Sequence, residues 1–455
     1  MITSTIKFSQ LEDRIDAEYY KPEYLEIEKL FSQIKRQPRT ISLLDALTYI
    51  KGYAFESEYY AKEGDIGIYR VSNIENGVNL SDIIKVPSFF WEKFKKFRIR
   101  PRDIIMTVTG NTVGKAILMP DRISPLLINQ NAAIWRTKGK VNQFYLYVFI
   151  TAKPFQTKIK RIARAGTRPF IGIDILKETF IPFPPQSFQQ KIEKMVKESQ
   201  RKRKLADEKY KEAEEILNKE LGLENLDLST QKTFEAKFSE TKERIDPEYY
   251  QPKYYKFWKM IRKRADLKKL QDIISKIDYG TVPTSPYVSK EQGIPYIKGK
   301  DIKPNHIILD SLDYLHKGTK YLMRDKIVKE NDILITQMGT VGNAAVIPKE
   351  AEGFAFGSFI LRIRLKDFSK TNPYYIAAIV NSLVGKLQIF REMRIATVRA
   401  NTDIPTIKNL QIPILPRPIQ QKISSLIRES FKLRREAKEL IEEAKREVEE
   451  MVEEK

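Results

Sequence analysis

The chain has 455 residues, and 42% of them are hydrophobic, so it can build substantial cores and is not a disordered protein. It has no cysteine and only two histidines, which excludes disulfide bonds and a zinc site made of cysteine and histidine. Because 81 lysines and arginines stand against 59 aspartates and glutamates, the net charge is +22, which favours a polyanionic partner such as nucleic acid over a merely solubilising surface. No secretory signal opens the chain and no apolar run approaches about 20 residues, so we expect a cytoplasmic protein.

An internal repeat runs through the whole chain. The segment RIDAEYYKPEY at residues 14–24 returns as RIDPEYYQPKY at 244–254. IPFPPQSFQQKI at 181–192 returns as IPILPRPIQQKI at 412–423. Two separated anchors with almost the same offset indicate a tandem duplication of one domain with its connecting element.

From this repeat we predict four parts of the chain. They are a first domain at residues 1–185, a central helix at 186–222, a second domain at 223–416 and a distal helix at 417–455.

Each copy begins with elements of a sheet. The RIDxEYY segment is followed by short apolar stretches that break into a polar, glycine-containing loop, at residues 67–77 and 293–305, which is typical of a strand and its turn. Residues 102–120 and 331–349 then each predict two strands that flank a polar glycine loop, which forms an antiparallel hairpin.

Further strands and a helix complete each copy. Strands are expected at residues 132–138 and 359–366, and a single helix at about 144–163 and 373–393, before the proline-rich segment closes the domain. The mixture predicts an α+β domain (mixed α/β) with a largely antiparallel sheet.

Each proline-rich segment leads into a long helix. Apolar residues recur at matched positions with steps of four and three, as in a coiled-coil seam: Ile192 with Ile423, Val196 with Ile427, Ala206 with Ala437, Tyr210 with Ile441, Ala213 with Ala444, and Leu217 with Val448. We favour mutual pairing over a lone charged helix or an oligomerisation zipper. If a pseudo-two-fold axis relates the copies, the helices run antiparallel, and about 32 helical residues would separate the domains by roughly 50 Å.

Two motifs suggest catalysis but do not support it. GNTVGK at residues 110–115 is one residue too short between its glycines for a phosphate-binding loop, and Ala116 stands where a hydroxyl is needed. NPYY at 372–375 lacks the second proline of the Asn-Pro-Pro-Tyr motif of adenine methyltransferases, so proline at the start of a helix explains it better. We find no glycine-rich cofactor loop, carboxylate cluster or metal ligand set, and we predict neither catalysis nor a bound cofactor.

The proline-rich segments followed by Gln-Gln-Lys-Ile, together with the RIDxEYY segments, resemble the specificity (S) subunit of type I restriction–modification systems over the whole chain. The resemblance implies two target-recognition domains that each read one half of a bipartite, asymmetric DNA target. It also implies that the helices set the gap and dock two methyltransferase (M) subunits, which carry S-adenosylmethionine and modify adenine N6, with restriction (R) subunits as further partners. The alternatives are the recognition subunit of another multi-subunit restriction enzyme and a non-catalytic coiled-coil scaffold.

Residues that read bases should differ between copies if the half-sites differ, because specificity depends on side-chain donors and acceptors. The RIDxEYY segments do not differ, which favours a structural or docking role for them. A basic face near the end of each domain helix, which includes Lys158, predicts phosphate contacts, with ordinary solvated charge as the alternative. The candidate DNA-binding residues are Arg70, Ser72, Asn73, Thr109, Asn111, Lys115, Arg161, Arg164 and Arg168 in the first copy, and Lys298, Lys300, Gln337, Thr340, Asn343, Arg391, Arg394, Arg399 and Asn401 in the second.

Overall fold

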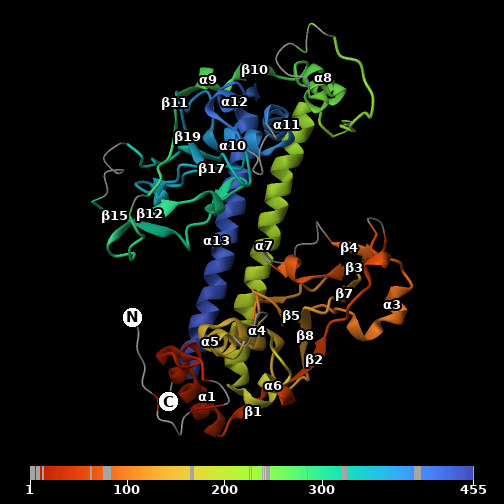
Figure 1. Cartoon of the computed structure of the whole chain (residues 1–455), viewed down its shortest axis with the longest axis vertical. Coiled ribbons are helices and arrows are strands. Elements are labelled where there is room, and N and C mark those ends of the chain that lie inside the picture. The colour runs from red at the N-terminus through yellow and green to blue at the C-terminus, as the bar shows by residue number, and fades with distance from the viewer. Residues whose placement is uncertain are drawn as a thin grey trace. The chain divides into compact units, whose positions relative to one another are not determined.

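The computed structural model (Figure 1) divides into two compact units, residues 1–203 with 435–455, and residues 204–434. It describes residues 6, 11–12, 15–61, 64–74, 83–163, 169–224, 226, 228–237, 239, 241, 246–283, 285–318, 325–393 and 401–453. None of the helices in these ranges has the length and apolar character needed to span a bilayer.

Among its described residues, the first unit contains three sheets and a group of helices. Its strands are β1 (Thr40–Ser42), β2 (Leu47–Lys51), β3 (Ile66–Tyr69), β4 (Ile84–Val86), β5 (Ile104–Thr107), β6 (Ala116–Leu118), β7 (Leu126–Ile128), β8 (Ala132–Thr137) and β9 (Phe180–Pro182). Its helices are η2 (Ala17–Tyr20), α1 (Pro22–Arg36), α2 (Leu43–Ala46), η3 (Ser57–Tyr59), η4 (Val71–Ile74), α3 (Phe90–Lys93), η5 (Lys95–Phe97), α4 (Gln143–Thr151), α5 (Lys153–Ile162), α6 (Asp174–Glu178) and the start of α7 (Gln186–Leu221).

The second unit repeats this order. Its strands are β10 (Asp266–Lys269), β11 (Ile274–Tyr279), β12 (Gly293–Ile297), β13 (Ile302–Lys303), β14 (His306–Ile307), β15 (Asp313–His316), β16 (Ile333–Thr336), β17 (Ala344–Val346), β18 (Ala355–Phe356), β19 (Ile360–Leu365) and β20 (Gln411–Ile414). Its helices are η7 (Pro247–Tyr250), α8 (Pro252–Ile261), α9 (Leu270–Ile273), η8 (Gly299–Asp301), η10 (Lys349–Ala351), α10 (Pro373–Asn381), α11 (Leu383–Glu392), α12 (Ile404–Lys408) and the start of α13 (Arg417–Glu453).

A four-stranded antiparallel sheet lies at the centre of each unit. The strand order is β2-β8-β5-β6 in the first unit and β11-β19-β16-β17 in the second. Both predicted hairpins, β5–β6 and β16–β17, are confirmed. A three-stranded sheet, β4-β3-β7 or β15-β12-β18, adds one parallel pair to each unit. The predicted α+β class with a largely antiparallel sheet is therefore confirmed.

The central strands are buried on both faces. Along β5, Ile104 and Met106 pack into the cluster that contains α4 and α5, whereas Ile105 packs towards the three-stranded sheet. Residues Ile333 and Ile335 of β16 face helices, and Leu334 faces the other sheet. Alternation of side chains along a strand gives each unit this three-layer order of helices, central sheet and small sheet.

The single helix predicted after the sheet is wrong in both copies, because each copy has two helices there. Pro154 has no backbone N–H to continue α4, and the side chain of Gln156 donates to the freed carbonyl of Ile150 at 2.6 Å. In the second copy Ser382 starts a new helix, since its hydroxyl accepts from the N–H of Val384 at 3.2 Å.

The proline-rich anchors are retained because they tie the long helices to the domains. The Gln189 side chain accepts from the Asn142 N–H at 2.9 Å and donates to the Pro184 carbonyl at 2.9 Å. Gln420 does the same with Asn372 and Leu415, at 3.2 and 2.9 Å. The first Gln of each Gln-Gln-Lys-Ile segment thus has a structural role.

The two long helices pair antiparallel within each unit, as predicted. In the first unit the Ser199 hydroxyl donates to the Ala437 carbonyl at 2.6 Å, and Lys191 pairs with Glu447. In the second unit Lys209 pairs with Glu429 and Glu212 pairs with Lys422, so residue numbers rise along α7 as they fall along α13. The predicted seam residues are buried, except for the half-buried Tyr210 and Ile441. The helix α7 ends as expected before Gly222, which has φ of +70°.

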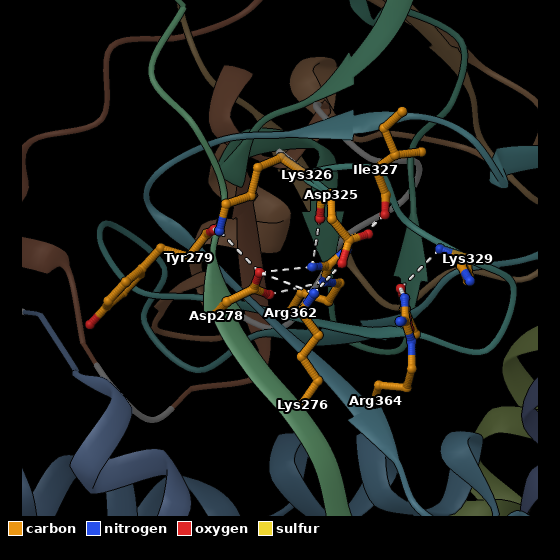
Figure 2. A network of polar contacts seen from close by, with 10 residues as sticks. Lys276, Asp278, Tyr279, Asp325, Lys326, Ile327, Lys329, Arg362 and Arg364 are labelled. Atoms are coloured by element: carbon orange, nitrogen blue, oxygen red, sulfur yellow. Dashed lines mark hydrogen bonds and ion pairs between the residues drawn. The ribbon is translucent and has the colours of Figure 1, made fainter. Parts of the chain in front are cut away.

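One polar network distinguishes the two central sheets (Figure 2). In the second unit the fully buried Arg362 donates to both carboxylate oxygens of Asp278, at 2.9 and 2.7 Å, across the β11–β19 ladder. It also donates to the carbonyls of Ile327 and Asp325, which fixes the segment beside the sheet. The first unit has the apolar cross-strand pair Ile50 and Ile134 in the same places. The copies therefore share a backbone frame but not this part of the core.

Candidate nucleic-acid interface

The glycine loop of each predicted hairpin lies at one end of the central sheet. Gly110 and Gly339 have backbone φ angles of +103° and +80°, values that residues other than glycine rarely adopt. Three candidate residues on these loops, Asn111, Lys115 and Thr340, are exposed. Asn343 is half-buried, and its N–H donates to the Thr336 hydroxyl at 3.0 Å, so it helps to close its own loop.

The start of each glycine loop is hydrogen-bonded to a second chain segment on one side and to a third on the other. In the first unit the N–H of Val108 donates to Asn131 O at 2.9 Å, and Ile171 N–H donates to Val108 O at 2.9 Å. We call the resulting surface, formed by residues 108–111, 129–131 and 169–171, the first platform. It contains the candidates Thr109 and Asn111.

The second unit has the same arrangement. Gln337 N–H donates to Phe359 O at 2.9 Å, and Thr402 N–H donates to Gln337 O at 3.1 Å. Residues 337–340, 357–359 and 401–402 form the second platform, and it brings together the candidates Gln337, Thr340 and Asn401.

A close backbone approach supports both platforms. A Cβ atom on Gly52, just after β2, would lie 2.1 Å from Asn129 O. A Cβ on Gly280, just after β11, would lie 2.2 Å from Gly357 O. Since atoms cannot approach so closely, both positions require glycine, and the platforms are built on a tight frame.

The candidates after β3 and β12 divide by exposure. Ser72 and Lys300 are exposed. Asn73 is buried, and its side chain accepts from the Arg70 N–H at 2.9 Å, which shapes the turn. Lys298 is half-buried and pairs with Asp313. Burial acts to lower the pKa of Lys298, but its hydrogen bonds to Asp313 and Tyr287 outweigh this effect and raise it.

Arg161 is buried and Arg391 is half-buried, and both contact tyrosines of their own unit. The Arg161 guanidinium donates to the Tyr19 carbonyl at 3.2 Å and lies 3.8 Å from the centre of that ring. Arg391 donates to the Tyr249 carbonyl at 3.0 Å and lies 4.2 Å from its ring centre. Each arginine thus holds the tyrosine of a RIDxEYY segment, which gives that repeated segment the predicted structural role.

The first of these networks also contains acids. Glu12 and Glu28 pair with Arg161 at 2.9 and 3.0 Å, and the buried Lys158 pairs with Glu28 at 2.9 Å. Burial acts to raise the pKa of Glu12, but hydrogen bonds from Tyr19 and Arg161 lower it overall. Lys158 and Arg161 are therefore engaged inside the protein, and we leave Arg161 and Arg391 out of the proposed interface. Arg164, Arg168, Arg394 and Arg399 lie outside the described residues.

Sequence reasoning did not single out three exposed platform residues, Asn131, Phe170 and Phe359. An alignment of the two copies that allows for their small insertions could have identified them, because the aligned positions carry different types of side chain. Among the described residues, no group of three or more histidines, cysteines, aspartates or glutamates could hold a metal ion.

A match to a protein-family model agrees with this two-copy organisation. A family model of the type I restriction modification DNA specificity domain matches residues 39–215 and 263–446. The MjaIX type I restriction enzyme specificity subunit of Methanocaldococcus jannaschii is 24% identical over 352 residues, which are 74% of this chain and 72% of that protein. The EcoAI specificity subunit of Escherichia coli is 26% identical over 149 residues, which are 32% of this chain and only 25% of that protein. Among solved structures, the S subunit of a type I restriction-modification system from M. genitalium shows a TM-score of 0.46 at 14% identity, over 91% of this chain and 94% of that one.

Proposed function

Because the chain belongs to the family of type I restriction–modification DNA specificity domains, we propose that it is the sequence-specific DNA-binding subunit of such a complex. Each unit would read one half of a bipartite, asymmetric duplex target. The observation that carries this proposal is the presence of one exposed, polar platform on the same backbone frame in each unit. The net charge of +22 supports a polyanionic partner.

The proposed interface contains the exposed candidates and the half-buried residues of the platforms. A side chain can read a base edge or contact a phosphate only if it reaches solvent. This criterion retains Ser72, Thr109, Asn111, Lys115, Lys300, Gln337, Thr340 and Asn401.

We further propose that the chain is not itself an enzyme. Two methyltransferase subunits would supply S-adenosylmethionine and transfer a methyl group to adenine N6, and restriction subunits would add cleavage. The sequence supports this assignment because neither copy has a glycine-rich cofactor loop after a strand. The long helices α7 and α13 would hold the methyltransferase subunits and set the unread gap. The end of α13 suits a protein partner, since residues 434–455 have nine acids against six bases. The four-part domain division predicted from the repeat is part of this proposal.

Binding of the purified chain with its methyltransferase partners to a library of duplexes tests this function. We expect selection of one bipartite sequence with at least about 1,000-fold preference over random duplex. Affinity should fall steeply as salt rises, because phosphate contacts release counterions. In a parallel labelled-methyl assay the chain alone should transfer no methyl group. Binding without sequence preference would favour the scaffold alternative, and methyl transfer by the isolated chain would contradict the non-catalytic assignment.

A further inference from the structure

The two platforms carry the same pair of side-chain types in exchanged places. Backbone hydrogen bonds define equivalent positions: Asn131 and Phe359 each accept at the start of the central segment. On the other side, Phe170 forms a bridge with Thr109, and Asn401 forms the equivalent bridge with Met338. The first platform therefore has asparagine on the first side of its central segment and phenylalanine on the second side, whereas the second platform has phenylalanine on the first side and asparagine on the second.

All four side chains are accessible. Phe170 is 47% exposed and Phe359 is 56% exposed, and both asparagines are exposed. Within the described residues, only the backbone groups of Asn131 and Asn401 form hydrogen bonds, and their side-chain amides form none. The Nζ of Lys51 lies 5.1 Å from the centre of the Phe170 ring, which puts a cation beside it.

These two side-chain types match the edges of one base pair. An asparagine amide can donate to and accept from adenine in the major groove, at N6 and N7, and an apolar ring can contact the methyl group of thymine. A lysine beside such a ring can contact a backbone phosphate without reading the sequence.

Building on the proposed function, we propose that Asn131 and Phe170 determine the half-site of the first unit, and Phe359 and Asn401 that of the second. Each amide reads an adenine and each ring contacts a thymine methyl group. The two side-chain types lie on opposite sides of the central segment in the two units. The same backbone frame therefore places the adenine contact and the thymine contact at different positions of the two half-sites. The asymmetry of the target then arises from this exchange as well as from the glycine loops.

Mapping of methylated sites tests the inference in the complete complex with its methyltransferase subunits. The variants are Asn131→Ala, Phe170→Ala, Phe359→Ala and Asn401→Ala. Each should lower the preference for the original base by about tenfold to 100-fold at one or two positions of a single half-site. The other half-site should stay unchanged. The matched controls are Phe89→Ala in the first unit and Phe368→Ala in the second, since these rings are 54% and 45% exposed and lie off the platforms. They should leave both half-sites intact.

Two results would overturn the inference: unchanged preference at every position, or an equal loss at both half-sites. If an alanine variant does not fold, Asn131→Gln and Phe170→Leu keep polar and apolar character while moving the contacting atoms, and they should still alter only the first half-site. The result for the unchanged chain separates the two proposals. A wild-type complex with no bipartite target contradicts the proposed function, whereas a bipartite target that no platform variant alters contradicts only this inference.

Discussion

Asp278 and Arg362 show how one pair of residues can differ between two copies of the same sheet. In the first unit the equivalent pair is Ile50 and Ile134, and both sides of the ladder are apolar. Since Arg362 is fully buried, removal of its partner would leave a charge without compensation. The pair is therefore required as a unit rather than as two separate residues.

The substitution Asp278→Ile should destabilise the second unit by about 3–5 kcal/mol, because it leaves the fully buried Arg362 guanidinium without its carboxylate partner. The double variant Asp278→Ile with Arg362→Ile carries the apolar pair of the first unit, and it should be about 1–3 kcal/mol more stable than Asp278→Ile alone. Denaturant unfolding measures both. Lys276→Met is the control: it removes the partly exposed pair with Asp325 and a 4.0 Å contact with Asp278 but leaves the Arg362–Asp278 hydrogen bonds in place, and it should cost below about 1 kcal/mol. A double variant no more stable than Asp278→Ile alone would contradict this prediction.

His306 provides a pH-dependent contribution to stability. Its ring stacks on Phe431, with centroids 5.1 Å apart, and burial lowers its pKa below the usual value, helped by the nearby charges of Arg434 and Lys303. The unfolded chain therefore binds a proton more readily than the folded one. The stabilisation is fully present above about pH 6.5 and is lost as the pH falls through the folded-state pKa.

We expect that His306→Phe will reduce the loss of thermal stability between pH 7.5 and pH 5.5. Phenylalanine keeps a stacked ring but cannot take up a proton. Because the chain has only one other histidine, His316, the His316→Phe variant is a suitable control. If His306→Phe and the wild type lose stability equally over this range, His306 is not the group responsible.

At the scale of elements, a buried serine occupies the same seam position in each long helix. The Ser199 hydroxyl donates to the Ala437 carbonyl at 2.6 Å. Ser430 is also fully buried, but its hydroxyl has no hydrogen-bond partner within the described ranges. The same residue type therefore has two different energetic roles.

The substitution Ser199→Ala should lower the free energy of unfolding by about 1 kcal/mol, since it removes a buried hydrogen bond. Ser430→Ala should be neutral or slightly stabilising, because it removes a buried hydroxyl that has no partner. Each variant serves as the control for the other in thermal or denaturant unfolding. Equal destabilisation by both variants would mean that the Ser199 and Ser430 hydroxyls contribute equally to stability.

The elements that were predicted well are those specified by neighbouring residues. The hairpins follow from apolar strands around a polar glycine loop, and Asn372 caps α10 at the NPYY segment, as expected for a helix start. The break between α4 and α5 was missed because the apolar pattern continues through it, although Pro154 was visible in the sequence. Local pattern thus identified element types better than their ends.

The candidate site was harder to predict, because exposure depends on distant residues. Arg161 and Lys158 look like a basic face in sequence, but Glu12 and Glu28, which are far away in the chain, pair with them. The repeat itself gave the better guide. Residues retained in both copies proved to hold the frame, and exposed positions that differ, such as Asn131 and Phe359, lie on the platforms.

At the scale of the whole molecule, the helix register determines how the spacer proposal can be tested. Lys202 faces Glu436 at 2.6 Å in the first unit, and Asp207 faces Arg434 at 2.9 Å in the second. Insertions that lengthen both helices together must therefore lie opposite one another, after Arg203 and after Arg434.

Seven inserted residues at both points preserve the seam, because the seam repeats every seven residues. They add roughly 10 Å of helix, or about three base pairs of duplex. We predict a target with the same half-sites and a gap longer by about three base pairs, as measured by methylation-site mapping. The same insertion in α7 alone should mispair the helices and weaken binding. A doubly inserted protein that still methylates the original spacing would rule out the helices as the spacer.

The central claim is that this chain selects the DNA sites at which its partner subunits act. It is tested most directly by mapping methylated adenines across the genome of cells that carry the methyltransferase subunits with this chain, without it, and with it restored. We predict that one bipartite, asymmetric motif is methylated only when the chain is present. Methylation of the same motif in its absence would contradict the claim.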